Sequence, residues 1–150
     1  MKYTVSITID KPIDYVIEKF DDPDNLKHWQ KGLQSFELTE GKEGEIGSKY
    51  LIKYKMGKRE MDMVETIVER NLPENFAASY EAKGMWNLVD NHFSTNEAGG
   101  TLLTSHNTFK PKGFMKVMMF LMPGLFKKQS MKFLKAFKAF AEDGTSVLEG

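Results

Sequence analysis

Gly113-Phe114-Met115-Lys116-Val117-Met118-Met119-Phe120-Leu121-Met122-Pro123-Gly124 is the stretch that decides the fold, together with its continuation to Asp143. In that continuation four phenylalanines recur at spacings of seven, four and three residues, which places on one helical face Phe126, Phe133, Phe137 and Phe140. The other face carries Lys128, Lys132, Lys135 and Lys138. The pattern predicts one amphipathic helix over residues 112–143, kinked at Pro123 because proline removes a hydrogen bond of the preceding turn.

The residues before this helix read mainly as strands. Tyr3, Val5, Ile7 and Ile9 alternate with polar residues, which is typical of a strand with one buried face. Two short helices are predicted over residues 12–20 and 22–31, and six further strands fit between the turns of residues 33–111. We therefore expect a single α+β domain over residues 1–150, with a curved antiparallel sheet of about seven strands wrapped around the long C-terminal helix.

Composition excludes several classes of site. The chain has 21 basic and 21 acidic residues, so its charge does not favour a nucleic-acid partner, and without cysteine it has no disulfide or thiolate metal site.

The apolar run Phe114–Met122 contains Lys116 and is less than half the ~20 residues of a membrane span. Met1-Lys2-Tyr3-Thr4 lacks the apolar core of a signal peptide, so a cytoplasmic protein is expected. The lysines of residues 110–143 form either a solvated face or a surface for transient contact with an anionic membrane or partner.

Several short motifs resemble one superfamily. They are Asp24-Asn25-Leu26-Lys27-His28-Trp29, Gly44-Glu45-Ile46-Gly47-Ser48-Lys49-Tyr50, Gly99-Gly100-Thr101-Leu102-Leu103-Thr104 and Phe109-Lys110-Pro111-Lys112-Gly113. The chain from Lys2 to about Asp143 is similar to the helix-grip proteins called SRPBCC or START-related, which include polyketide cyclases and dehydrases. The resemblance implies a helix-grip fold and a cavity for a hydrophobic ligand between the sheet and the C-terminal helix. The chain departs from the expected pattern in the four methionines between Met115 and Met122.

A sheet curled over an amphipathic helix encloses either a solid core or a cavity, and the resemblance favours a cavity. The residues expected to line it are Phe36, Tyr50, Tyr54, Met63, Tyr80, Phe93, Phe109 and Met118, with Asn91, Ser105 and Asn107 as polar anchors. The methionines Met115, Met118, Met119 and Met122 form a pliable lid, ordinary core packing or a lid that touches a membrane. A cavity of about 300 Å³ or more is expected, opening near residues 115–122.

The last hairpin sets which polar residues face inward. A three-residue loop at 98–100 would pair Glu97 with Thr101 and continue the ladder as Phe93–Ser105, His92–His106 and Asn91–Asn107. His92 and His106 then lie on the outer face beside Asp90. Two histidines on a flat sheet lack the third protein ligand of a catalytic zinc, so we predict neither a metal site nor a catalytic role for them.

The expected function is binding or carriage of a small hydrophobic molecule such as a lipid, an isoprenoid or an aromatic polyketide-like compound, without a cofactor. The alternatives are a cyclase or dehydratase that uses the same cavity, and a protein-interaction module of the cochaperone type that uses the outer sheet face at Trp86 and Leu88. The sequence contains no nucleophile elbow, phosphate loop or zinc-protease motif. The strongest sign of an enzyme would be an inward Glu65 or Glu69, depending on a bulge predicted near Val64.

Overall fold

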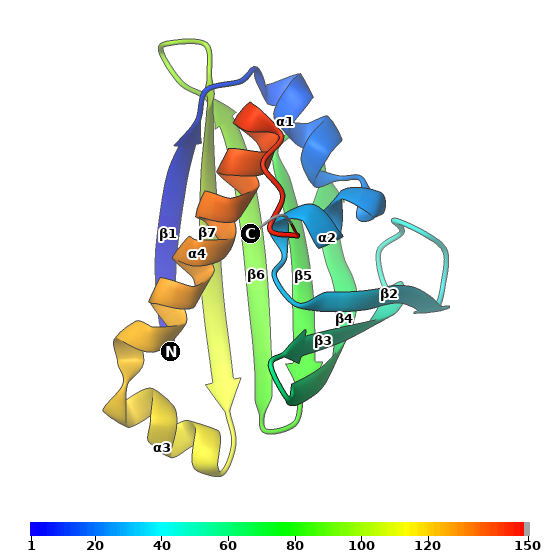
Figure 1. Ribbon diagram of the computed structural model, residues 1–150, viewed down its shortest axis with the longest axis vertical. Coiled ribbons are helices and arrows are strands. Elements are labelled where there is room, and N and C mark those ends of the chain that lie inside the picture. The colour runs from blue at the N-terminus through cyan, green and yellow to red at the C-terminus, as the bar shows by residue number, and fades with distance from the viewer. Residues whose placement is uncertain (149–150) are drawn as a thin grey trace.

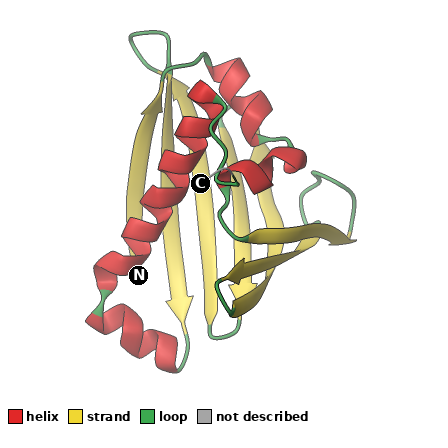
Figure 2. Cartoon of the chain, viewed as in Figure 1, coloured by secondary structure: helices red, strands yellow, loops and turns green. Residues whose placement is uncertain are grey.

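The computed structural model describes residues 1–148 and confirms the predicted α+β helix-grip fold (Figures 1 and 2). The strands are β1 (Lys2–Ile9), β2 (Leu33–Glu40), β3 (Lys49–Met56), β4 (Arg59–Asn71), β5 (Asn75–Ala82), β6 (Met85–Thr95) and β7 (Thr101–Pro111). The helices are α1 (Ile13–Phe20), the single 3₁₀ turn η1 (Pro23–Asn25), α2 (Leu26–Trp29), α3 (Phe114–Leu121) and α4 (Pro123–Asp143). The strands form one antiparallel sheet in the order β1-β7-β6-β5-β4-β3-β2, so β1 and β2 are its edges.

Three helices cover one face of the sheet, which we call the inner face. Figure 1 shows α1, α2 and α4 in front of this face, while β2 and β3 turn across it and give the sheet its strong curvature. The alternation in β1 explains the contact with α4, because Val5 and Ile9 are buried on the inner face and the intervening residues are more exposed.

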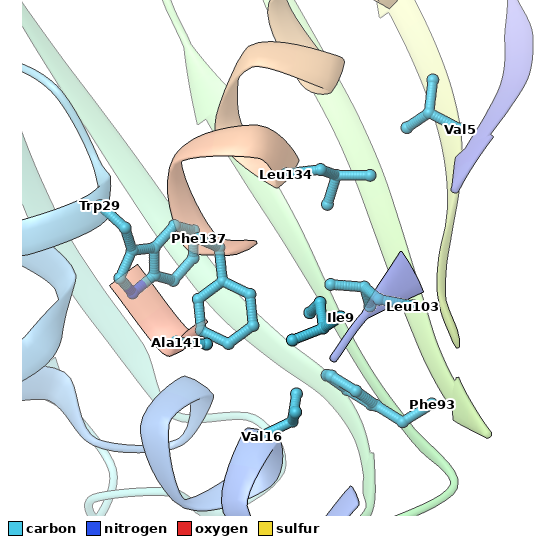
Figure 3. Packing of buried hydrophobic residues seen from close by; sticks show 9 residues of the cluster. All are labelled: Val5, Ile9, Val16, Trp29, Phe93, Leu103, Leu134, Phe137 and Ala141. Atoms are coloured by element: carbon cyan, nitrogen blue, oxygen red, sulfur yellow. The ribbon is translucent and has the colours of Figure 1, made fainter. Parts of the chain in front are cut away.

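Phe137 on α4 joins the helices to the sheet. Its side chain is 1% exposed, and its ring lies edge-on to Phe20 of α1 and Trp29 of α2, with centroids 5.5 and 5.1 Å away. Ile9 and Leu103 belong to the same cluster of buried side chains (Figure 3). The core therefore lies between α4, the two short helices and the β1–β7–β6 part of the sheet.

The prediction of one kinked helix over 112–143 is wrong, because the chain breaks into α3 and α4. Met122 leaves the helical conformation, with φ −132° and ψ 62°, and Pro123 begins α4 at a position where its missing N–H costs no hydrogen bond. Gly144 ends α4 in the left-handed conformation, and its N–H donates a hydrogen bond to the carbonyl of Phe140. In Figure 1, α3 extends from the end of the sheet rather than along α4.

The predicted three-residue loop between β6 and β7 is also wrong. Thr95 pairs with Thr101, and the side chain of Asn96 accepts hydrogen bonds from the N–H groups of Ala98 and Gly100 at 3.1 and 2.9 Å. The ladder is therefore displaced by two residues from the predicted one, with pairs Phe93–Leu103, Asn91–Ser105, His92–Thr104 and Val89–Asn107. A displacement of two residues leaves each side chain on its predicted face, because the period of a strand is two.

The bulge in β4 lies at Val68, not near Val64 as predicted. It separates the pair Ile67–Ala78 from the pair Glu69–Ala77. The extra residue shifts the alternation, so that Glu65 and Arg70 share the inner face while Glu69 points outward.

Candidate functional site

A cavity of about 270 Å³ lies on the inner face, between strands β2 to β5 and the helices α1 and α2. Its apolar wall consists of Phe20, Pro23, Leu26, Trp29, Phe36, Ile52, Ile67 and Phe76. Its polar residues are Asp21, Gln30, Glu43, Tyr50, Glu65, Arg70 and Tyr80, and Gly44 completes it. An apolar wall combined with polar groups that can orient a ligand is common in small-molecule sites.

The β2–β3 side of the cavity is held by Tyr50. Its ring stacks on Phe36, with centroids 4.5 Å apart and planes 13° from parallel. Its hydroxyl accepts a hydrogen bond from the N–H of Gly44 at 2.9 Å, which ties the loop between β2 and β3 to the cavity wall. This aromatic wall is therefore built from adjacent strands rather than from a mobile side chain.

Glu65 is the buried carboxyl of the cavity. Its side chain is 8% exposed and hydrogen-bonds to Tyr80, the residue opposite it on β5. Burial raises the pKa of Glu65 above its ordinary value, and the hydrogen bond from Tyr80 opposes that shift only in part. Burial also raises the pKa values of Tyr80 and Tyr54, with the Glu65 charge as a second cause, so both phenols keep their protons. Glu65 can donate or accept a hydrogen bond according to its protonation state.

Trp29 has a hydrogen-bond donor without a partner among residues 1–148. Its side chain is 7% exposed and lines the cavity, and its indole N–H has no hydrogen-bond partner within residues 1–148. A buried donor without a partner costs about 1–3 kcal/mol, so native proteins satisfy nearly all of them. The indole nitrogen of Trp29 has almost no accessible surface, so an acceptor oxygen on a bound molecule or a water would reach it only after a small shift of the surrounding side chains.

An ion pair stands at the cavity's edge, between α1 and β4. The guanidinium of Arg70 donates two hydrogen bonds to the carboxylate of Asp21, each at 2.6 Å, and both side chains are about one-third exposed. The parallel fork is the geometry that arginine provides and lysine does not. The pair fixes the end of α1 over the cavity.

We predict that Arg70→Lys lowers the free energy of unfolding by about 1 kcal/mol, because one point charge replaces two directed hydrogen bonds. Arg59→Lys is the matched control, since Arg59 lies exposed on the same strand, and it should change stability by less than about 0.5 kcal/mol. Urea denaturation of both variants measures the difference. Equal losses in the two variants would contradict a structural role for the fork.

Of the predicted ligand residues, Phe36, Tyr50 and Tyr80 line the cavity. The others are not among its lining residues: Tyr54, Met63, Asn91, Phe93, Ser105, Asn107, Phe109, Met115, Met118, Met119 and Met122. Their contact with a ligand stays a prediction. The expected mouth near Met115–Met122 and a wall from the C-terminal helix are wrong for this cavity, which lies beneath α1 and α2 and includes no residue of α3 or α4.

Three of those residues have other surroundings. Tyr54 donates a hydrogen bond to the side chain of Gln30 at 2.6 Å, behind the lining. Asn107 is buried and donates to the hydroxyl and the carbonyl of Ser105, both at 3.3 Å, so this predicted pair of anchors is satisfied internally. Sequence reasoning missed Phe20, Trp29 and Arg70 as lining residues. The tryptophan motif had marked Trp29 only as a sign of the fold.

The histidines lie away from the cavity. The rings of His92 and His106 are 5.2 Å apart, His92 lies 3.0 Å from the carboxylate of Asp90, and His106 hydrogen-bonds to Thr4 on β1 at 2.9 Å. Within residues 1–148 no three histidine, cysteine or acidic side chains meet in a group that could hold a metal ion.

Trp86 and Leu88, the candidates for an interaction patch on the outer sheet face, are only partly exposed. The ammonium group of Lys110 lies 4.8 Å from the Trp86 ring centroid and covers part of it. This observation does not favour a protein-interaction module of the cochaperone type.

The chain is similar to one known protein family and to several solved structures. Residues 1–142 match the family described as polyketide cyclase / dehydrase and lipid transport. Similar structures include a conserved protein from Geobacillus kaustophilus (17% identity, 94% of this chain and 95% of that one, TM-score 0.77) and the protein TTHA0849 from Thermus thermophilus (14%, 94% and 97%, 0.75). Ara h 8.0201 is also similar (14%, 94% and 97%, 0.74). No curated protein matches the sequence.

Proposed function

The chain belongs to the polyketide cyclase / dehydrase and lipid transport family, and we propose that it binds a compact apolar molecule with a hydroxyl or carbonyl group beneath α1 and α2. The observation that carries the proposal is the combination, in the lining of one cavity, of an aromatic wall, the buried carboxyl of Glu65 and Trp29, whose indole N–H has no partner among residues 1–148. An apolar core alone requires neither polar group.

The cavity's volume limits the size of the ligand that fits. A cavity of about 150 Å³ accommodates benzene, so the 270 Å³ here suits a molecule of about two fused rings. Aromatic side chains on facing walls, Trp29 on α2 and Phe36 on β2, offer such rings stacking or edge contacts. The volume favours an aromatic polyketide-like compound over a long-chain lipid.

The polar groups of the cavity determine which functional groups the ligand carries. The Trp29 N–H requires an acceptor, and Glu65 accepts from a hydroxyl when ionised and donates to a carbonyl when protonated. A fully apolar ligand would leave the indole donor unsatisfied. We therefore expect a phenol to bind better than the parent hydrocarbon.

The test uses 2-naphthol and naphthalene as probes. Wild-type protein should bind one equivalent of 2-naphthol, measured by its fluorescence, with a preference over naphthalene of about tenfold, the effect of about one good hydrogen bond. Ile67→Trp fills the cavity from β4 and should weaken 2-naphthol binding about 100-fold or more, because the space for two rings is lost.

Val68→Trp is the control, since Val68 is the next residue of β4 and is exposed. It should bind 2-naphthol like the wild type. Ile67→Phe fills less of the cavity and should give an intermediate affinity, provided that thermal melting shows each variant folded. Unchanged binding in the folded Ile67→Trp variant would show that the probe does not occupy this cavity.

A second candidate function rests on Glu65 alone. Burial raises the pKa of Glu65, so this carboxyl holds its proton to higher pH than an exposed one and can give it to a leaving hydroxyl, as general acids in apolar sites do. In a dehydratase that converts 3-hydroxy-1-tetralone to 1-naphthol, Glu65 would give its proton to the C3 hydroxyl, which leaves as water. The carboxylate so formed would take the proton from C2, and the resulting enone would tautomerise to 1-naphthol. Turnover by the wild type, lost in Glu65→Gln while 2-naphthol still binds, would select the enzyme over the carrier.

A further inference from the structure

We propose that α3 and the first turns of α4 form a docking surface for a membrane that contains anionic lipids. The surface consists of Phe114, Val117, Phe120 and Leu121 on α3, and of Leu125, Lys127, Lys128 and Lys132 on α4. It is separate from the cavity beneath α1 and α2 and contains none of the residues that line it.

The helix α3 is apolar on all sides, and only one side is covered. Met119 is buried, and Met115 faces Gly84 in the turn between β5 and β6. On the opposite side Phe114 is 73% exposed, Phe120 85% and Leu121 66%. Lys116 is the single polar residue of the helix. A helix that is apolar all round is normally buried in a core or in lipid, so the exposed side lacks a partner.

The chain on both sides of this helix carries charge of one sign. Residues 98–141 contain eight lysines and no aspartate or glutamate. Leu125, Lys128 and Lys132 follow at spacings of three and four, so they continue the apolar surface into a basic one on the same side of α4. Beside them a groove of about 620 Å³ between α4 and the edge strand β1 is lined by Lys127, Lys128, Lys132 and Lys135 among others. Apolar side chains beside lysines match the acyl and phosphate layers of a membrane surface.

The same charge argues against a second copy of this chain as the occupant. A twofold contact through this face would place the lysines of α4 close to their own copies, with no acidic side chain in residues 98–141 to compensate them. The break at Met122 lets α3 stand away from the axis of α4 at one end of the molecule, where a flat surface can reach it (Figure 1). Among residues 1–148, no helix combines the length and the hydrophobicity that crossing a membrane needs, so the contact is peripheral.

Vesicle cosedimentation tests the proposal. Wild-type protein should bind phosphatidylcholine vesicles that contain about 30% phosphatidylglycerol, bind pure phosphatidylcholine much less, and release from the former at about 1 M salt. Phe120→Ser should weaken partitioning about tenfold, because the variant lacks an exposed phenylalanine side chain that would enter the acyl layer of the membrane. The double variant Lys127→Gln, Lys128→Gln should weaken it about 25-fold, since each lysine near an anionic surface contributes about fivefold.

The controls lie on the other side of the molecule. Ile46→Ser removes another exposed apolar side chain, and the double variant Lys53→Gln, Lys55→Gln removes two exposed lysines of β3. Both should bind vesicles like the wild type. Absence of binding to anionic vesicles, or equal losses in test and control variants, would overturn the proposal. A wild-type dimer that Phe120→Ser converts to a monomer in sedimentation velocity would overturn it in favour of self-association. The Phe120→Ser variant should bind 2-naphthol like the wild type. Failure of the membrane proposal is therefore distinguishable from failure of the proposed ligand binding in the cavity.

Discussion

Replacing Phe137 by alanine is expected to lower the free energy of unfolding by about 3–5 kcal/mol, the usual cost of removing a large aromatic side chain from a core. The ring is 1% exposed and contacts Phe20 of α1 and Trp29 of α2 edge-on. Helices this short have little stability of their own and depend on packing. The variant should therefore loosen both helices over the cavity as well as destabilise the domain, and 2-naphthol binding should weaken with it.

Phe120→Ala is the matched control, because it makes the same substitution at a ring that is almost fully exposed on α3. Its free energy of unfolding should stay within about 0.5 kcal/mol of the wild type. Urea denaturation at constant pH measures both variants. A loss below about 1.5 kcal/mol for Phe137→Ala would mean that the neighbouring side chains collapse into the space and that Phe137 does not join the helices to the sheet.

The fold was predictable because its elements have strong periodic signals. Tyr3, Val5, Ile7 and Ile9 alternate over the whole of β1, and Phe133, Phe137 and Phe140 repeat at helical spacing in α4. Such patterns report which side of an element is buried, and seven strands with short turns leave few topologies. The resemblance to the helix-grip superfamily pointed to the same arrangement.

Local chain geometry was less predictable, because a single residue decides it. Periodicity continues across Pro123, so the sequence alone does not distinguish a kink from the break at Met122, which depends on that residue's backbone angles. The β6–β7 loop depends on Asn96, whose side chain binds two loop N–H groups and favours a five-residue connection over a three-residue one.

The cavity's position was the least predictable feature. Patterns mark burial without marking empty space, so Phe93 in the core and Phe36 on the cavity wall look alike in the sequence. The bulge at Val68 then decides that Arg70 and not Glu69 faces inward. Bulges depend on how strands pair, and residues 61–68 show only that the alternation changes somewhere.

Replacing Glu65 by glutamine is expected to raise the free energy of unfolding at pH 8, by of the order of 2 kcal/mol, because the buried carboxylate has few partners. Burial raises its pKa in the folded state above the unfolded value. As pH rises above the unfolded value, the unfolded chain loses this proton first, so the wild type's stability falls until the folded carboxyl also ionises. Below the unfolded pKa both states hold the proton and the contribution vanishes. The glutamine variant should lack this decline.

Glu81→Gln is the control, since Glu81 follows Tyr80 on β5 but is exposed on the outer face. Its stability should follow the wild-type pH profile within about 0.5 kcal/mol. Urea denaturation between pH 4 and pH 9 (about the range that brackets a raised carboxyl pKa) gives the profiles. If Glu65→Gln and the wild type declined in parallel, the carboxyl would be as well solvated folded as unfolded.

A side chain that lowers stability persists in proteins chiefly where a function requires it, and the cavity offers that function to Glu65. A ligand hydroxyl that donates a hydrogen bond to the carboxylate would supply a second partner beside Tyr80. Glu65→Leu should therefore be more stable than the wild type at pH 8 and lose the part of the roughly tenfold preference for 2-naphthol over naphthalene that the Trp29 N–H does not supply. Affinity for naphthalene should stay equal or rise, because leucine leaves the aromatic walls in place. Parallel losses for both probes would instead mean that the substitution deforms the cavity and that Glu65 does not select the hydroxyl.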